Sequence, residues 1–183
     1  WRTLARGGFL YLSPHSRREI RELLPGTERD GGTRFPLSLR EPPPREIPEH
    51  PGSNNWRFRV PEGRVVRFTD ARCGPLAFTA GEDFGDFLVW RRDDAPAYEL
   101  AGAVDDLAQG ITEVVRGEDL LLSTARQLLL LEALGGSPPT YCHLPLVRDP
   151  TGRRLSKTER DLALRELRAR GHSPSEVLAM PVA

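Results

Sequence analysis

Residues 97–147 read AYELAGAVDDLAQGITEVVRGEDLLLSTARQLLLLEALGGSPPTYCHLPLV, and this stretch decides the fold class. Its apolar residues first recur at helical spacing as far as Gly110, and a β-branched strand pattern follows over 111–115. A Thr–Gln pair at capping-box spacing predicts a second helix over 124–134, and a second strand pattern covers 141–147. The order helix, strand, helix, strand predicts an α/β layer with a mostly parallel sheet.

The chain outside this stretch divides into two further regions. Residues 1–55 predict short helices, the first at residues 1–5 and the second at 17–24, followed by a proline- and glycine-rich loop region. From residue 56 the apolar period changes to two, which predicts a β-hairpin insertion over 56–95, with its first two strands joined by the turn at 61–63. Residues 96–183 then carry the α/β layer.

Composition excludes several classes of protein. The 183 residues are 38% hydrophobic, with 26 basic and 26 acidic side chains and two cysteines. A disordered chain, a collagen, a coiled coil and a disulfide scaffold are therefore excluded, and no apolar run approaches the ~20 residues that cross a bilayer. The neutral net charge gives no evidence for nucleic-acid binding by itself. Two cysteines and no signal-peptide pattern predict a cytoplasmic protein without a membrane segment.

The ends of the chain carry an expectation of their own. The sequence begins with Trp1, and its only methionine is Met180. We therefore expect an internal piece of a longer gene product, with part of the active site upstream.

The sharpest chemical motif is GRRLSKT at residues 152–158, on a turn after a strand pattern. A loop that glycine makes flexible, and that carries a serine hydroxyl and a lysine, can place the lysine ammonium against a polyphosphate. The motif alone is also compatible with an ordinary solvated basic loop.

A second motif is the arginine of VVRGED at residues 114–119. Ligands of open α/β sheets sit at the carboxyl ends of strands, so Arg116 is a candidate for bidentate capture of a carboxylate. The alternative is an edge arginine paired with Glu118 or Asp119. Tyr98, on the preceding helix, is expected to line the same pocket, with a core or rim tyrosine as the alternative.

Six blocks in order and spacing resemble the catalytic domain of class I glutamyl-tRNA synthetases. Within that family they are most similar to the truncated paralogues, the glutamyl-queuosine tRNA(Asp) synthetases. The blocks are DFLVWRR at 86–92, YELA at 98–101 with VDD at 104–106, GIT at 110–112, VVRGEDLL at 114–121, STARQ at 123–127, and RLSK at 154–157. The resemblance implies the second half of a Rossmann-type catalytic domain over 96–183.

The resemblance also implies roles for single residues. Arg154, Leu155, Ser156 and Lys157 match the KMSKS loop and would bind ATP, which brings Mg²⁺ with it, and Lys157 would be catalytic by stabilising the transition state of adenylate formation. Arg116 and Tyr98 would bind glutamate, the first at a carboxylate and the second through a hydrogen bond.

A zinc site is not expected, although the family often has one near residues 9–20. This segment offers Ser13 and His15 where the family has cysteines, and a structural zinc ion needs four nitrogen or sulfur ligands. We therefore predict no metal site and a degenerate zinc-binding segment.

The function implied is ATP-dependent activation of glutamate without tRNA, followed by transfer to queuosine of tRNA(Asp), by a monomer that also needs the upstream half of the domain. This piece alone is expected to be inactive. The alternatives are a glutamyl-tRNA synthetase that charges tRNA(Glu), and a non-catalytic fragment that acts as a binding module.

Overall fold

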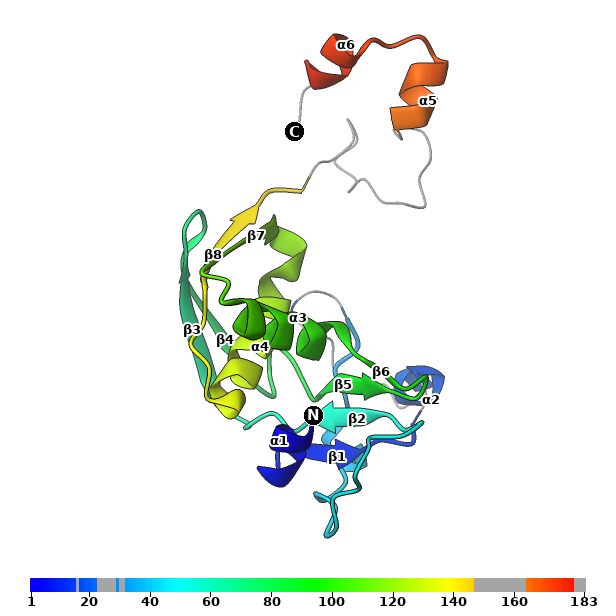
Figure 1. The fold of residues 1–183 in the computed structure, drawn as a ribbon, viewed down its shortest axis with the longest axis vertical. Coiled ribbons are helices and arrows are strands. Elements are labelled where there is room, and N and C mark those ends of the chain that lie inside the picture. Colours follow the sequence, from blue (N-terminus) through cyan, green and yellow to red (C-terminus); the bar gives the residue numbers. More distant parts are fainter. Residues whose placement is uncertain (16, 23–28, 30–31, 147–163, 180–183) are drawn as a thin grey trace. The chain divides into compact units, whose positions relative to one another are not determined.

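The structure is a computed structural model that describes residues 1–15, 17–22, 29, 32–146 and 164–179. The chain forms two compact units, Trp1–His143 and Leu144–Ala183 (Figure 1). The second unit contains the short helices α5 (Leu164–Ala169) and α6 (Pro174–Leu178). A capping box in which Ser173 and Glu176 bond each other's backbone N–H groups starts α6 at the Ser-Pro pair.

The first unit holds two four-stranded sheets (Figure 1). One has the order β1-β2-β5-β6 and is antiparallel throughout. Its strands are β1 (Leu10–Leu12), β2 (Trp56–Phe58), β5 (Phe87–Arg91) and β6 (Ala95–Pro96). The other has the order β4-β3-β8-β7, with β3 antiparallel to β4 and parallel to β8. Its strands are β3 (Val65–Asp70), β4 (Gly74–Thr79), β7 (Glu113–Gly117) and β8 (Thr140–Leu144).

The α/β class predicted from residues 97–147 is confirmed. Helix α3 (Tyr98–Gln109) precedes β7, and helix α4 (Leu121–Leu134) connects β7 to β8. Both helices end where the sequence places glycine. Gly110 and Gly135 adopt left-handed backbone conformations, with φ of 64° and 73°, which glycine accepts without steric penalty.

The start of α4 corrects a prediction. The helix begins at Leu121, after a 3₁₀ turn over Glu118–Leu120, so Thr124 lies inside the helix rather than at a capping box. Its hydroxyl instead lies 3.2 Å from the carbonyl oxygen of Leu120, four residues earlier. The strand predicted over 111–115 is likewise shifted, and β7 covers Glu113–Gly117 with Arg116 inside it.

The pairing of the strands after residue 56 also corrects a prediction. The strands around Trp56 and Val65 do not pair with each other across the turn at 61–63. Instead β2 lies between β1 and β5, whereas β3 forms its hairpin with β4. The reason is visible at Val60, which is buried and whose backbone N–H donates to the Asp86 carboxylate at 2.9 Å. That contact directs the chain away from β2 and into the second sheet.

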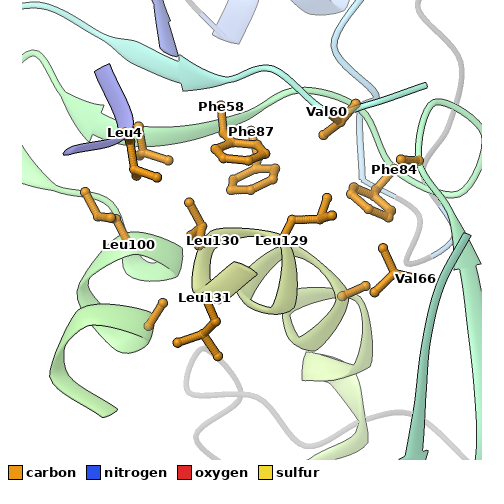
Figure 2. Close-up of a cluster of buried hydrophobic side chains, with 14 of the residues drawn as sticks. Leu4, Phe58, Val60, Val66, Phe84, Phe87, Leu100, Leu129, Leu130 and Leu131 are labelled. Carbon is orange, nitrogen blue, oxygen red and sulfur yellow. The ribbon is translucent and has the colours of Figure 1, made fainter. Parts of the chain in front are cut away.

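The core of the first unit lies where the sheets meet α3 and α4 (Figure 2). Phe58 and Phe87 stack with ring centroids 5.3 Å apart, and they face Leu130 on α4. Burying side chains of this size contributes about 1.5–3 kcal/mol each, so this layer fixes α4 against the antiparallel sheet. The shorter helices α1 (Arg2–Arg6) and α2 (Arg17–Glu22) and a 3₁₀ turn at Leu37–Leu39 complete the unit. In the described parts of the chain, no helix has the length and apolarity needed to cross a membrane.

Candidate amino acid binding site

Arg116 occupies β7 just before the chain turns into α4. Its Nε donates to His143 Nε2 at 3.2 Å, and its Nη2 donates to Thr124 Oγ1 at 2.6 Å. The guanidinium also lies over the ring of Tyr141, 5.5 Å from the centroid. These neighbours are uncharged or aromatic, so they orient the guanidinium without neutralising it.

Among the described residues, Arg116 does not form the ion pair with Glu118 or Asp119 that was the alternative role for it. Glu118 pairs instead with Arg72 at 2.7 Å, and Arg116 forms no ion pair with any residue of the described segments. A half-buried guanidinium without a carboxylate is suited to bind one from a ligand.

Tyr98 begins α3 and is 56% exposed. It lines a cavity of about 480 Å³, together with Asp86 and three arginines, Arg57, Arg91 and Arg126. The lining thus combines three guanidinium groups with the carboxylates of Asp86 and Glu99, and the volume is in the range of pockets that hold a small polar molecule. The rim position of Tyr98 leaves its hydroxyl accessible to such a molecule.

Glu99, which is buried on α3, also lines this cavity. Ser123 Oγ donates to it at 2.9 Å, and Arg126 Nη1 lies 3.5 Å away. Burial raises the pKa of the Glu99 carboxyl, and this effect outweighs the charges of Arg126 and Arg116 and the Ser123 hydroxyl, which act to lower it.

The expectation that Tyr98 and Arg116 line one pocket is met only in part. Among the described residues that line the cavity, Tyr98 is present and Arg116 is not. Arg116 is nevertheless close enough for its charge to act on Glu99, which does line the cavity. Tyr98 and Arg116 therefore both lie near Glu99 without lining one cavity, and their roles in binding glutamate stay predictions.

The phosphate-binding prediction concerns a segment outside the described residues. Arg154, Leu155, Ser156 and Lys157 all fall between residues 147 and 163. The arrangement of Lys157 and Arg116 about a common cleft is accordingly a prediction still.

Sequence reasoning missed the residues that hold Arg116. The capping-box spacing predicts a helix cap at Thr124, and none of the sequence motifs includes His143, yet both side chains contact the Arg116 guanidinium. The signal was present for His143, because it shares a strand face with Tyr141 and that face is buried. A buried histidine needs hydrogen-bond partners, although the sequence does not say which.

In the segment predicted to be a degenerate zinc-binding segment, the Ser13 hydroxyl contacts an arginine. Ser13 Oγ accepts a hydrogen bond from Arg57 Nε at 3.1 Å, and the Arg57 guanidinium stacks over Phe35, 4.1 Å from the ring centroid. A cation thus occupies the surroundings of Ser13, and within the described segments no group of three or more His, Cys, Asp or Glu residues is placed to hold a metal.

The family follows from the sequence model that matches residues 16–180, which describes the catalytic domain of class I tRNA synthetases for glutamate and glutamine (E and Q). The chain belongs to this family. The order of blocks that suggested it, from residue 86 to residue 157, lies inside the matched range of this synthetase domain.

Relatives of the synthetase domain carry two kinds of name. A glutamyl-Q tRNA(Asp) synthetase of Dechloromonas aromatica is 39% identical over 186 residues, covering 96% of this chain and 60% of the relative. One from Pseudomonas putida strain W619 is 44% identical over 143 residues, covering 68% and 48%. Glutamate–tRNA ligase 1 of Methylococcus capsulatus is 46% identical over 124 residues, covering 68% and 26%. The chain therefore spans a quarter to three fifths of the length of these relatives.

The fold of the synthetase domain has solved counterparts as well. A glutamate tRNA ligase from Elizabethkingia meningosepticum, in complex with its amino acid, superimposes with a TM-score of 0.67 at 26% identity. The match covers 87% of this chain and 34% of the ligase, so the domain corresponds to about a third of that enzyme.

Proposed function

We propose that the protein containing this domain activates glutamate with ATP and transfers the glutamyl group to queuosine of tRNA(Asp), with no tRNA needed for the activation step. The observation that carries the proposal is Arg116, a half-buried guanidinium that is oriented by Thr124 and His143 and has no acidic partner among the described residues. Family membership and relatives named glutamyl-Q tRNA(Asp) synthetase support the choice of glutamate and of the acceptor.

In the proposed reaction, different residues of the chain bind the amino acid and the nucleotide. Arg116 binds a carboxylate of glutamate, and Tyr98 donates a hydrogen bond to the amino acid from the cavity rim. Lys157, with Arg154, Leu155 and Ser156, holds the phosphates of ATP and stabilises the charge that develops when the carboxylate attacks the α-phosphate and pyrophosphate leaves. Mg²⁺ accompanies the nucleotide.

The second candidate is a glutamyl-tRNA synthetase that charges tRNA(Glu). The specific observation in its favour is the 46% identity to glutamate–tRNA ligase 1 of Methylococcus capsulatus. The two candidates differ in what the activation step requires.

Glutamate-dependent ATP–pyrophosphate exchange by the full-length gene product separates them. Exchange in the absence of any tRNA, followed by glutamate incorporation into queuosine-containing tRNA(Asp), supports the proposal. Exchange that appears only after addition of tRNA(Glu) supports the second candidate. Absence of exchange under both conditions contradicts both and leaves the domain as a binding module.

Substitution of Arg116 tests the proposed glutamate contact directly. An Arg116→Gln variant should lose at least tenfold in affinity for glutamate, because a hydrogen bond between charged groups contributes about 1.5–3 kcal/mol. Arg64→Gln is the control, since Arg64 forms an exposed ion pair with Glu132. Titration calorimetry with glutamate reads out both variants, and unchanged affinity in Arg116→Gln removes Arg116 from the site.

A further inference from the structure

Arg116 is the outer member of a buried cluster that four elements build. Asp70 comes from the end of β3, His143 from β8, Thr124 from α4 and Arg116 from β7. Asp70 Oδ2 lies 2.6 Å from His143 Nδ1, and His143 Nε2 lies 2.9 Å from Thr124 Oγ1 and 3.2 Å from Arg116 Nε. The side chains of Asp70 and His143 have no exposed surface.

Asp70 fixes which nitrogen of His143 carries a proton. Its carboxylate accepts the backbone N–H groups of Arg72, Cys73 and His143. Burial acts to raise the pKa of Asp70, but these bonds together with the one from the His143 ring outweigh it and hold the pKa well below its ordinary value. An ionised carboxylate accepts only, so Nδ1 of His143 carries the hydrogen. Nε2 faces the N–H of Arg116 Nε at 3.2 Å and therefore presents its lone pair.

Arg116 Nε always carries a hydrogen, which it donates to Nε2, and Thr124 Oγ1 also lies beside Nε2, at 2.9 Å. Thr124 Oγ1 accepts from Nη2 of the same guanidinium. Two of the three guanidinium nitrogens are thereby held, whereas Nη1 of Arg116 has no hydrogen-bond partner in the described segments. Both acceptors are uncharged, so the positive charge of the guanidinium is oriented and left available.

We propose that His143 is a positioning residue that, oriented by Asp70, holds the Arg116 guanidinium in the direction needed to receive a carboxylate. The inference rests on the proposed function, because it takes glutamate as the carboxylate that Arg116 receives. Asp70 and His143 do not contact the ligand, and they act through Arg116 alone.

Two substitutions at His143 separate this role from a purely structural one. In His143→Asn the side-chain amide can still donate to Asp70, but it is too short to reach Arg116. In His143→Gln the side-chain oxygen falls near the place of Nε2 and can accept from Arg116, while the bond to Asp70 is lost. A structural role depends on Asp70 and therefore predicts greater damage from the glutamine variant.

Kinetics of pyrophosphate exchange by the full-length protein provide the first readout. The proposal predicts that His143→Asn raises KM for glutamate about tenfold, the equivalent of one lost hydrogen bond to a charged group. KM for ATP should change little, and His143→Gln should recover most of the glutamate affinity. Equal glutamate KM values in the two variants, or a larger effect in the glutamine variant, overturn the proposal.

A second pair of variants keeps the test decisive if substitutions at His143 prevent folding. Thr124→Val removes the acceptor of Arg116 Nη2 with little change of shape, and Thr124→Ser retains the hydroxyl. A rise in glutamate KM with valine and not with serine supports the positioning of Arg116 by its acceptors. The same KM in both overturns it.

Hydrogen exchange at Arg116 Nε, followed by NMR, distinguishes failure of the inference from failure of the proposed function. Exchange should be slow in the parent protein and in His143→Gln and fast in His143→Asn, whether or not glutamate is a substrate. If the parent protein shows slow exchange but no glutamate activation, the proposed function fails and the orientation of Arg116 by His143 stands. Fast exchange in all three proteins overturns the orientation itself.

Discussion

The carboxylate of Asp86 offers the sharpest test of what holds the first unit together. Its side chain has no exposed surface, and each of its oxygens accepts two hydrogen bonds. Oδ1 accepts from Arg40 Nη2 at 2.7 Å and from Val60 N at 2.9 Å, and Oδ2 accepts from Arg40 Nε and the Tyr11 hydroxyl at 2.7 Å each. The carboxylate thereby joins β1, the start of the β2–β3 connection and the loop that carries Arg40.

An Asp86→Asn substitution tests this arrangement with almost no change of volume. With its NH₂ group at the place of Oδ1 the amide faces two obligate donors, Arg40 Nη2 and Val60 N. At the place of Oδ2 it faces Arg40 Nε, whereas the Tyr11 hydroxyl can rotate and accept. In either orientation at least one hydrogen bond from Arg40 is lost, together with the buried charge that compensates Arg40 alongside Glu62. Arg40 is only 11% exposed, so its guanidinium cannot recover full hydration. Losing one partner of a buried ion pair destabilises by about 3–5 kcal/mol. Because Glu62 stays 2.7 Å from Arg40 Nη1, we expect the lower end of this range, about 3 kcal/mol.

Urea denaturation followed by tryptophan fluorescence measures the effect. With a slope of about 2 kcal/mol/M, the midpoint should fall by roughly 1.5 M in Asp86→Asn. The control is Glu132→Gln, which removes a two-contact ion pair with Arg64 whose partners are both more than half exposed. Such pairs contribute less than about 1 kcal/mol, so the control should shift by less than roughly 0.5 M. Equal shifts in the two variants would refute the reasoning.

Three further predictions follow from buried or functional charges. Folding lowers the pKa of Asp70, so its contribution to stability is complete above the ordinary carboxyl value of 3.8 and is lost as pH falls below it. In urea titrations, the difference in stability between the parent protein and Asp70→Asn should therefore shrink from pH 6 to pH 2. Folding raises the pKa of Glu99 from its ordinary value of 4.5, so the fold loses stability as pH rises through the raised pKa and the carboxyl ionises. Glu99→Gln should therefore be more stable than the parent protein at pH 7, and this gain should vanish below about pH 4. A loss of stability in Glu99→Gln at pH 7 contradicts the prediction. Lys157→Ala should lower the rate of adenylate formation by about 10²–10³ without weakening glutamate binding, which single-turnover assays and calorimetry measure separately; a strong loss of glutamate affinity contradicts the assignment to ATP.

The local elements of the fold could be predicted well from the sequence. The helix ends at Gly110 and Gly135 and the strand at Tyr141 follow from glycine chemistry and apolar periodicity, which act over a few residues. The predicted cap at Thr124 was wrong because capping-box spacing also occurs inside a helix. Here the Thr124 hydroxyl donates to the Leu120 carbonyl and accepts from Arg116. Arg116 could be selected as a candidate from its place at a strand end, but its partners could not.

By itself, then, the sequence determined the α/β class, the order of helices and strands over residues 97–146 and the family, because these depend on periodicity and on motifs that are local in the chain. Only the tertiary structure decided that β2 and β3 belong to different sheets, and that Asp70 orients His143 against Arg116. Asp70 and His143 are separated by 73 positions, and Tyr11 and Asp86 by 75. Alternation of apolar residues specifies which face of a strand is buried and leaves its neighbour open, since the neighbour is selected by hydrogen bonds and packing between segments that meet only in the folded chain.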